Sequence, residues 1–207
     1  PFPPEIEVER AYLRTRHRRA EERLRAHAAE LRRTAPPAEV AAWAGQTAAF
    51  LARHPDGWQT PAPAAAILRA NKPLANAAVR IGDDGFALPE KPLARNDTLQ
   101  LTLTPGPGTV AAVRVEVTAG SGGAFAGTVA KNRGTFRVAL SRRDAAGATQ
   151  RLPVVHAEAA AKDRRYKDGE EVLGVTTGWK LPALAEGQTV AAVWLLETPV
   201  ALAEGET

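Results

Sequence analysis

The 207-residue sequence contains no cysteine, and this absence excludes several kinds of chemistry. Without cysteine the chain forms no disulfide, offers no thiolate to a metal, has no thiol nucleophile and attaches no haem through a C-x-x-C-H motif. Methionine is absent too. Together with the abrupt start Pro1-Phe2-Pro3-Pro4 and the polar end Ala203-Glu204-Gly205-Glu206-Thr207, its absence predicts a processed chain or a domain excised from a longer protein.

Aromatic residues and long apolar runs are also scarce. Only 5% of the residues are aromatic, whereas 44% are hydrophobic and many of those are alanine, so the core is expected to consist mainly of Val, Leu and Ala. No stretch approaches the roughly 18 apolar residues of a membrane-spanning helix, and no membrane span is predicted. The length suits one domain of about 140 residues with an appendage.

The chain is basic, with a net charge of +4 and a pI near 9.8. The positive charge is concentrated between Arg10 and Arg33, where Glu9, Glu21, Glu22 and Glu30 are interleaved with the arginines. Such a mixed-sign pattern is typical of a solvated helix face. No aromatic side chains stand among these arginines to stack on bases, so nucleic acid is not an expected partner.

Two helices are predicted at the N-terminus, over Ile6 to Arg33 and Pro37 to His54. Prolines 36 and 37 end the first, because the residue before a proline is pushed out of the α region. The first helix carries a heptad-like seam and the second one apolar face, so we expect an antiparallel helical hairpin over residues 1–55. The seam consists of Leu13, His17, Ala20, Leu24, His27 and Leu31, and the face of Val40, Trp43, Thr47, Phe50 and Leu51.

From residue 56 to 200 the pattern is typical of antiparallel β structure, and residues 201–207 are expected to form a tail. Apolar and polar residues alternate, which indicates half-buried strands, and Gly and Pro separate the segments. We therefore predict a mainly β fold, an antiparallel β-sandwich of jelly-roll type, after the helical hairpin. The clearest strands are Leu99–Leu103, Val113–Val117, Phe136–Leu140 and Val190–Leu196, and weaker ones are Val79–Ile81, Val154–Ala157 and Trp179–Leu181.

The glycine-rich stretch GSGGAFAGTVAKNRGTFRVAL, residues 120–140, does not match a phosphate-binding loop. Gly122 and Gly127 have P-loop spacing, but Thr128 stands where lysine is required and a strand pattern follows. The stretch is interpreted as a connection between two strands. Its residues Lys131, Asn132 and Arg133 are candidates to face a ligand at the rim of the sandwich.

Other candidate sites have a simple structural alternative. Asp83, Asp84 and Asp168 could supply carboxylates to calcium, although Asp-Gly is first of all a turn signal. Trp179 follows a loop-like Thr-Thr-Gly segment and is the best candidate for an exposed, sugar-stacking aromatic, whereas Trp194 lies in an apolar run and is expected in the core. The four histidines have no metal-ligand spacing, and neither serine lies in a G-x-S-x-G elbow.

The order of segments resembles the β-sandwich part of planctomycete-type cytochrome c domain proteins, which are large multidomain proteins of the cell envelope. The resemblance rests on Asp84-Gly85-Phe86, Asn96-Asp97-Thr98-Leu99, Val110–Val117, Asn132–Val138, Thr177-Gly178-Trp179 and Ala192-Val193-Trp194. It implies a galactose-binding-like module in an extracytoplasmic protein, with haem held by another domain and no cofactor in this chain. The segment from Lys162 to Gly174 is more charged than its counterpart in that family.

Three functions are compatible with these patterns. The first is a non-catalytic accessory module that binds neighbouring domains and recognises carbohydrate. The second is a structural spacer whose helices dock neighbouring domains. The third is an enzyme of glycan cleavage, which requires two carboxylates about 5–9 Å apart across a groove.

Overall fold

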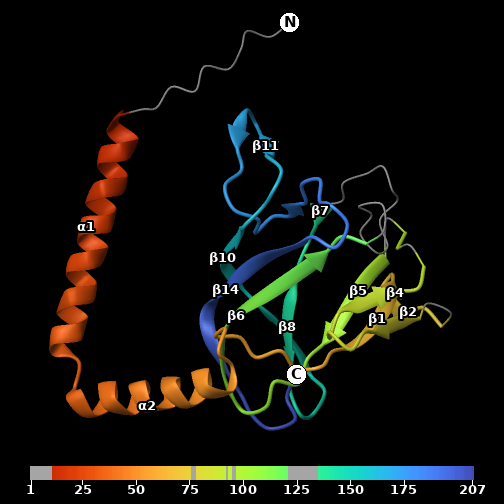
Figure 1. Ribbon diagram of the computed structural model, residues 1–207, viewed down its shortest axis with the longest axis horizontal. Coiled ribbons are helices and arrows are strands. Elements are labelled where there is room, and N and C mark those ends of the chain that lie inside the picture. Colours follow the sequence, from red (N-terminus) through yellow and green to blue (C-terminus); the bar gives the residue numbers. More distant parts are fainter. Residues whose placement is uncertain (1–10, 76–77, 92, 95–96, 121–134) are drawn as a thin grey trace, which may run out of the picture. The chain divides into compact units, whose positions relative to one another are not determined.

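The computed structural model describes residues 11–75, 78–91, 93–94, 97–120 and 135–207 (Figure 1). The chain divides into two compact units, Pro1–Gln59 and Thr60–Thr207. The first unit holds the two helices and the second holds the strands. Among the described residues, no helix combines the length and apolarity needed to cross a membrane.

Both predicted helices are present, as α1 (Ala11–Thr34) and α2 (Pro37–Arg53). Helix α2 begins with proline, whose fixed φ suits the first turn. Along α1, ion pairs of the i,i+3 and i,i+4 type connect arginines and glutamates: Arg18–Glu22 at 3.9 Å, Arg25–Glu21 at 3.4 Å and Arg33–Glu30 at 2.6 Å. These exposed pairs agree with a solvated, mixed-sign face.

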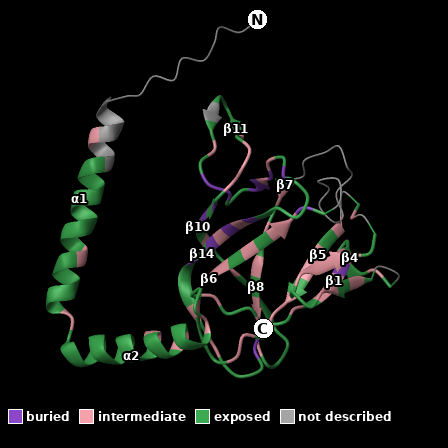
Figure 2. Cartoon of the chain, viewed as in Figure 1, coloured by how far each residue is buried: buried purple, intermediate pink, exposed green. Residues whose placement is uncertain are grey.

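The expected packed helical hairpin is not observed. Leu24 and Leu31 of the predicted seam are 69% and 55% exposed, and Trp43 of α2 is 65% exposed. No residue of α2 is buried, and in Figure 2 both helices are coloured as exposed along most of their length. The prediction was wrong because apolar periodicity identifies a face that needs cover but does not say what covers it.

The second unit is built from antiparallel strand pairs. Its larger sheets have the strand orders β2-β1-β5 and β10-β14-β6, and two-stranded ladders join β3 to β4, β7 to β13, β8 to β9 and β11 to β12. The described strands are β1 (Ala64–Arg69), β2 (Lys72–Pro73), β3 (Val79–Ile81), β4 (Ala87–Pro89), β5 (Asp97–Thr102), β6 (Gly108–Thr118), β7 (Thr135–Phe136), β8 (Leu140–Arg143), β9 (Thr149–Leu152), β10 (Val154–Ala159), β11 (Tyr166–Lys167), β12 (Glu170–Glu171), β13 (Trp179–Lys180) and β14 (Thr189–Leu202).

The core lies on one face of the β10-β14-β6 sheet. Along β14, alternate residues from Val190 to Leu196 are buried, and Trp194 is 1% exposed, as predicted. The register places Trp194 between Ala157 of β10 and Val113 of β6. Val175, Trp179, Leu181 and Leu184 pack against this face from the segment that leads into β14. Figure 2 shows the buried residues concentrated on β10, β14 and that segment.

The single strand predicted over Phe136–Leu140 is divided in two. Thr135 and Phe136 form β7, which pairs with β13, and β8 begins at Leu140 and pairs with β9. Phe136, Val138 and Leu140 still pack against the core. The alternation therefore identified the buried side chains correctly, whereas ladder hydrogen bonds depend on a neighbouring strand that the local sequence does not specify.

Residues 201–207, expected to form a tail, belong to the β-rich unit. Ala201 pairs with Thr109 and Leu202 with Gly108 at the end of β14. Glu206 is only 7% exposed and forms an ion pair of 2.9 Å with Arg142. Thr207 exchanges two backbone hydrogen bonds with Arg143, of 2.6 and 3.1 Å. The polar composition of residues 201–207 gave no indication that they form these contacts with the rest of the β-rich unit.

Candidate functional site

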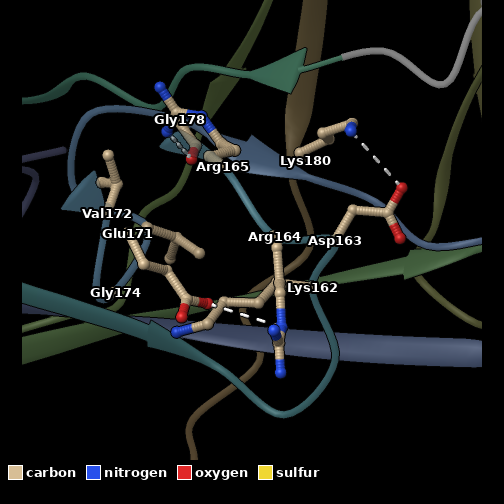
Figure 3. Close-up of a pocket in the computed structure, with 10 residues that line it drawn as sticks. Lys162, Asp163, Arg164, Arg165, Glu171, Val172, Gly174, Gly178 and Lys180 are labelled. Carbon is tan, nitrogen blue, oxygen red and sulfur yellow. Dashed lines mark hydrogen bonds and ion pairs between the residues drawn. The ribbon is translucent and has the colours of Figure 1, made fainter. Parts of the chain in front are cut away.

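A cavity of about 210 Å³ lies beside the β11–β12 hairpin and is the candidate site (Figure 3). We name it the basic pocket because four basic side chains line it against two acidic ones. The charged lining residues are Lys162, Arg164, Arg165, Lys180, Asp163 and Glu171, and the remaining ones are Val172, Gly174, Val175 and Gly178. Cationic side chains are the commonest charged groups of this lining, and they offer a place for an anion.

The hairpin beside the pocket is formed by a two-residue turn. Lys167 pairs with Glu170 across the turn residues Asp168 and Gly169, whose φ angles are +53° and +84°. Two positive φ angles in succession characterise a type I′ turn, and Asp-Gly is one of its preferred sequences. Asp168, a candidate calcium ligand, therefore has a turn-forming role that accounts for its position. The hairpin projects beyond the end of β10 (Figure 1).

Trp179 is fully buried, with an exposed fraction of 0%, and the prediction that it is an exposed sugar-stacking aromatic was wrong. Its indole Nε1 donates a hydrogen bond of 2.8 Å to the carbonyl oxygen of Ala161. Its ring packs against Trp194 and Phe136, with centroids 6.1 and 6.5 Å away. Trp179 thus holds the backbone next to Lys162, and its role at the pocket is to position that loop.

Two further contacts fix the loop that carries the basic residues. The backbone N–H of Asp163 donates to the carbonyl oxygen of Lys180 at 2.9 Å. Arg165 Nη1 donates to the carbonyl oxygen of Gly178 at 2.5 Å and to Thr177 Oγ1 at 3.3 Å. Gly178 is needed at this point, because a Cβ there would lie 2.7 Å from Thr135 Cγ2. These hydrogen bonds attach the loop that carries Asp163 and Arg165 to the backbone of Gly178 and Lys180.

The carboxylates of the pocket form ion pairs with its cations. Glu171 Oε1 lies 3.8 Å from Arg164 Nε, and Asp163 Oδ2 lies 3.7 Å from Lys180 Nζ (Figure 3). Both separations exceed the usual 2.7–3.2 Å of an N–H···O hydrogen bond. The lining residues thus comprise four cations and two carboxylates, and a third carboxylate, that of Glu158, lies next to Lys162.

Lys162 forms a close ion pair with a carboxylate. Its Nζ lies 2.5 Å from Glu158 Oε1, a carboxylate that projects from β10 outside the pocket lining. The hydrogen bond from Lys162 is the main reason why the pKa of Glu158 is lowered from its usual value, and burial opposes the shift. Glu158 therefore stays ionised near neutral pH and offsets the charge of Lys162.

Asp83 and Asp84, the other candidate calcium ligands, lie in the turn between β3 and β4. Asp84 Oδ1 accepts a hydrogen bond of 3.1 Å from the backbone N–H of Phe86, and Gly85 has a φ of +79°. This is an Asx turn, which explains the Asp-Gly sequence without a metal. Within the described part of the chain, no three His, Cys, Asp or Glu side chains are placed to hold a metal ion together.

The candidate ligand residues Lys131, Asn132 and Arg133 lie outside the described residues. The pocket itself was missed in the sequence, although the density of charge from Lys162 to Gly174 was visible there. The sequence did not show that Lys180, which belongs to β13 and follows Arg165 by 15 residues, lines the same pocket as Lys162, Arg164 and Arg165. Comparison of the chain with protein-family models, curated proteins and solved structures gave no match.

Proposed function

We propose that this protein is a non-catalytic interaction module whose N-terminal helices bind a neighbouring domain of a larger protein. The observation that carries the proposal is the exposure of large apolar side chains on both helices. Trp43, Leu24 and Leu31 are each more than half exposed, and Val40 and Leu51 are 46% and 43% exposed. Contiguous apolar faces of this kind usually mark sites of protein interaction.

The stability of α2 supports the same conclusion. It has 17 residues and buries none of them. Isolated helices shorter than about 12–15 residues are marginal in water, and most of the stability of helices in proteins comes from packing an apolar face. Val40, Trp43 and Leu51 recur at helical spacing on one face of α2. A partner that covers this face supplies the packing that the helix lacks within its own unit.

A second part of the proposal concerns the fold and the location of the β-rich unit. We propose that this unit is a sandwich of jelly-roll type, in which the β10-β14-β6 sheet packs on a second, less regular layer that contains β7 and β13. The resemblance to envelope cytochrome c domain proteins supports an extracytoplasmic location and a haem domain elsewhere in the parent chain. A sugar site built on Trp179 is not part of the proposal, because the ring is buried.

Hydrogen–deuterium exchange of this chain and of the longer protein that contains it tests the proposal. We expect the amides of α2 to exchange at least about tenfold more slowly in the longer protein, since docking suppresses local unfolding. The amides of β14, which lies in the core, serve as an internal reference and should be protected equally in both.

A pair of variants of the longer protein locates the contact. Trp43→Ser should abolish the added protection of α2, because Trp43 contributes the largest exposed apolar surface of that helix. Ala49→Ser is the matched control, because helical periodicity places the exposed Ala49 opposite Val40 and Leu51, and it should leave the protection intact. Equal protection of α2 in the two proteins, or equal loss with both variants, would contradict the proposed docking.

A further inference from the structure

We propose that the basic pocket binds the doubly charged phosphate group of a small polar phosphate monoester. This site lies in the β-rich unit and does not depend on the proposed docking of the helices. The first argument is charge: Lys162, Arg164, Arg165 and Lys180 converge on one cavity, and one positive charge remains in excess after Glu158, Asp163 and Glu171 are counted. An excess of positive charge in a recess with protein walls attracts anions more strongly than the same charge on a flat surface.

The second argument is preorganisation. Arg165 is fixed by two hydrogen bonds from Nη1, to Gly178 and Thr177. A guanidinium carries five N–H donors, so the N–H groups on its other nitrogens can bind an anion without releasing these contacts. The loop before Arg165 is tied down by the Trp179–Ala161 and Asp163–Lys180 hydrogen bonds. Fixed donors lose little conformational entropy when a ligand binds.

The third argument concerns the two loose ion pairs. Arg164 and Lys180 lie 3.8 and 3.7 Å from the carboxylates of Glu171 and Asp163. An anion that enters the pocket competes with those carboxylates for the same cations. A dianion gains more from two cations than a single carboxylate does, because the Coulomb attraction scales with its charge. The carboxylates therefore act against singly charged anions, sulfate esters included, and favour the dianion of a phosphate monoester.

The size of the pocket limits what the anionic group is attached to. Its volume of about 210 Å³ is below the roughly 300–1,000 Å³ of pockets that enclose drug-sized ligands. The cavity holds the charged group and the atoms next to it, and the rest of the ligand remains outside.

Nuclear magnetic resonance titration of the ¹⁵N-labelled chain with inorganic phosphate and, separately, with sulfate tests the proposal. Potassium chloride keeps the ionic strength constant. We expect saturable shifts, complete below about 10 mM, in the amides of residues 162–165 and 171–180. Saturable shifts with phosphate support the proposal, and free sulfate serves as a dianion of similar size. A response to sulfate with none to phosphate would overturn it. Shifts that do not saturate, or that spread over the whole basic surface, would overturn the proposal.

Two variants, one expected to weaken anion binding and one expected to tighten it, provide a further test. Lys180→Gln should weaken binding about tenfold, as expected when a charged hydrogen-bond donor is lost. Glu171→Gln should tighten it about two- to fivefold by removing a competing carboxylate. Arg80→Gln and Glu90→Gln, at exposed positions of the β3–β4 region, make the same changes in net charge and should have no effect. If either control matched its partner, binding would reflect net charge alone and the site would be rejected.

Discussion

Trp179 and Trp194 pack edge to face in the core of the β-rich unit, with ring centroids 6.1 Å apart and an interplanar angle of 65°. Both rings are essentially inaccessible to solvent. They differ in their polar atom: Trp179 Nε1 donates to Ala161, whereas Trp194 Nε1 has no hydrogen-bond partner among the described residues. Trp179 therefore links the core to the loop of the basic pocket, whereas Trp194 contributes apolar packing.

Replacing each tryptophan by phenylalanine separates these two roles. The two substitutions remove a similar ring volume, but Trp179→Phe also leaves the Ala161 carbonyl oxygen without its donor. Leaving a buried polar group unpaired costs about 1–3 kcal/mol. We therefore expect Trp179→Phe to lower the free energy of unfolding by about 1–3 kcal/mol more than Trp194→Phe does. Urea unfolding followed by far-ultraviolet circular dichroism measures the difference.

Trp194→Phe is the matched variant: it loses a similar ring volume but breaks no hydrogen bond, and it also removes an indole N–H that is buried without a partner among the described residues. Equal costs for the two variants would mean that the Ala161 hydrogen bond contributes nothing measurable to stability. In that case Trp179 would not be the residue that positions the pocket loop.

The two tryptophans also show what a single residue's surroundings in the sequence can predict. Trp194 stands among apolar residues that alternate with a period of two, and this pattern predicts burial. Trp179 follows Thr176, Thr177 and Gly178, a loop-like sequence that predicts exposure. The structure buries it because β13 pairs with β7, a contact between positions more than 40 residues apart that no local pattern records.

At the scale of elements, the segment from Gly174 to Leu184 connects the pocket hairpin to the core. The backbone N–H of Val175 donates to the carbonyl oxygen of Ala157 in β10 at 2.7 Å. Gly174 has a φ of +71°, and a Cβ at this position would lie 2.6 Å from the same carbonyl oxygen. Both the conformation and the close approach require glycine.

Gly174→Ala should therefore destabilise the protein more than an ordinary glycine replacement. Gly187→Ala is the matched control, since Gly187 has a φ of +74° and no atom within 4 Å of its Cβ position. We expect Gly187→Ala to cost about 1–2 kcal/mol, the penalty of a left-handed conformation. Gly174→Ala should cost about 1–3 kcal/mol more, because β10 has to move. The same urea unfolding measures both, and equal costs would show that the close approach is relieved without strain.

About half of the described strands of the β-rich unit were predicted from the sequence, whereas others, such as β1, β4 and β9, and most strand limits were not. The prediction for the last strand stopped at Leu196, before Pro199. In the structure β14 continues to Leu202 with a shift of register between Leu195 and Val200. Such an irregularity accommodates the proline while the pairing with β6 resumes beyond it.

For the whole molecule, the separation into two units makes a prediction about folding. Every residue of the buried core cluster falls between Ala119 and Trp194, inside the second unit. The hydrophobic burial that stabilises the strands therefore comes from that unit's own residues. The change from helical to alternating periodicity near residue 56 predicted the boundary between the two units. The sequence did not show that the helices leave their apolar faces uncovered.

We expect residues 60–207 alone to unfold cooperatively in urea with a free energy within about 0.5 kcal/mol of that of the β-rich unit in the full chain, the range typical of changes that touch no core contact. Far-ultraviolet circular dichroism and tryptophan fluorescence of both proteins measure it, because Trp179 and Trp194 report the core in each. A loss of several kcal/mol on removing residues 1–59 would mean that the helices cover apolar surface of the β-rich unit. Their exposed side chains would then have a partner within the same chain, and the proposed docking to a neighbouring domain would be contradicted.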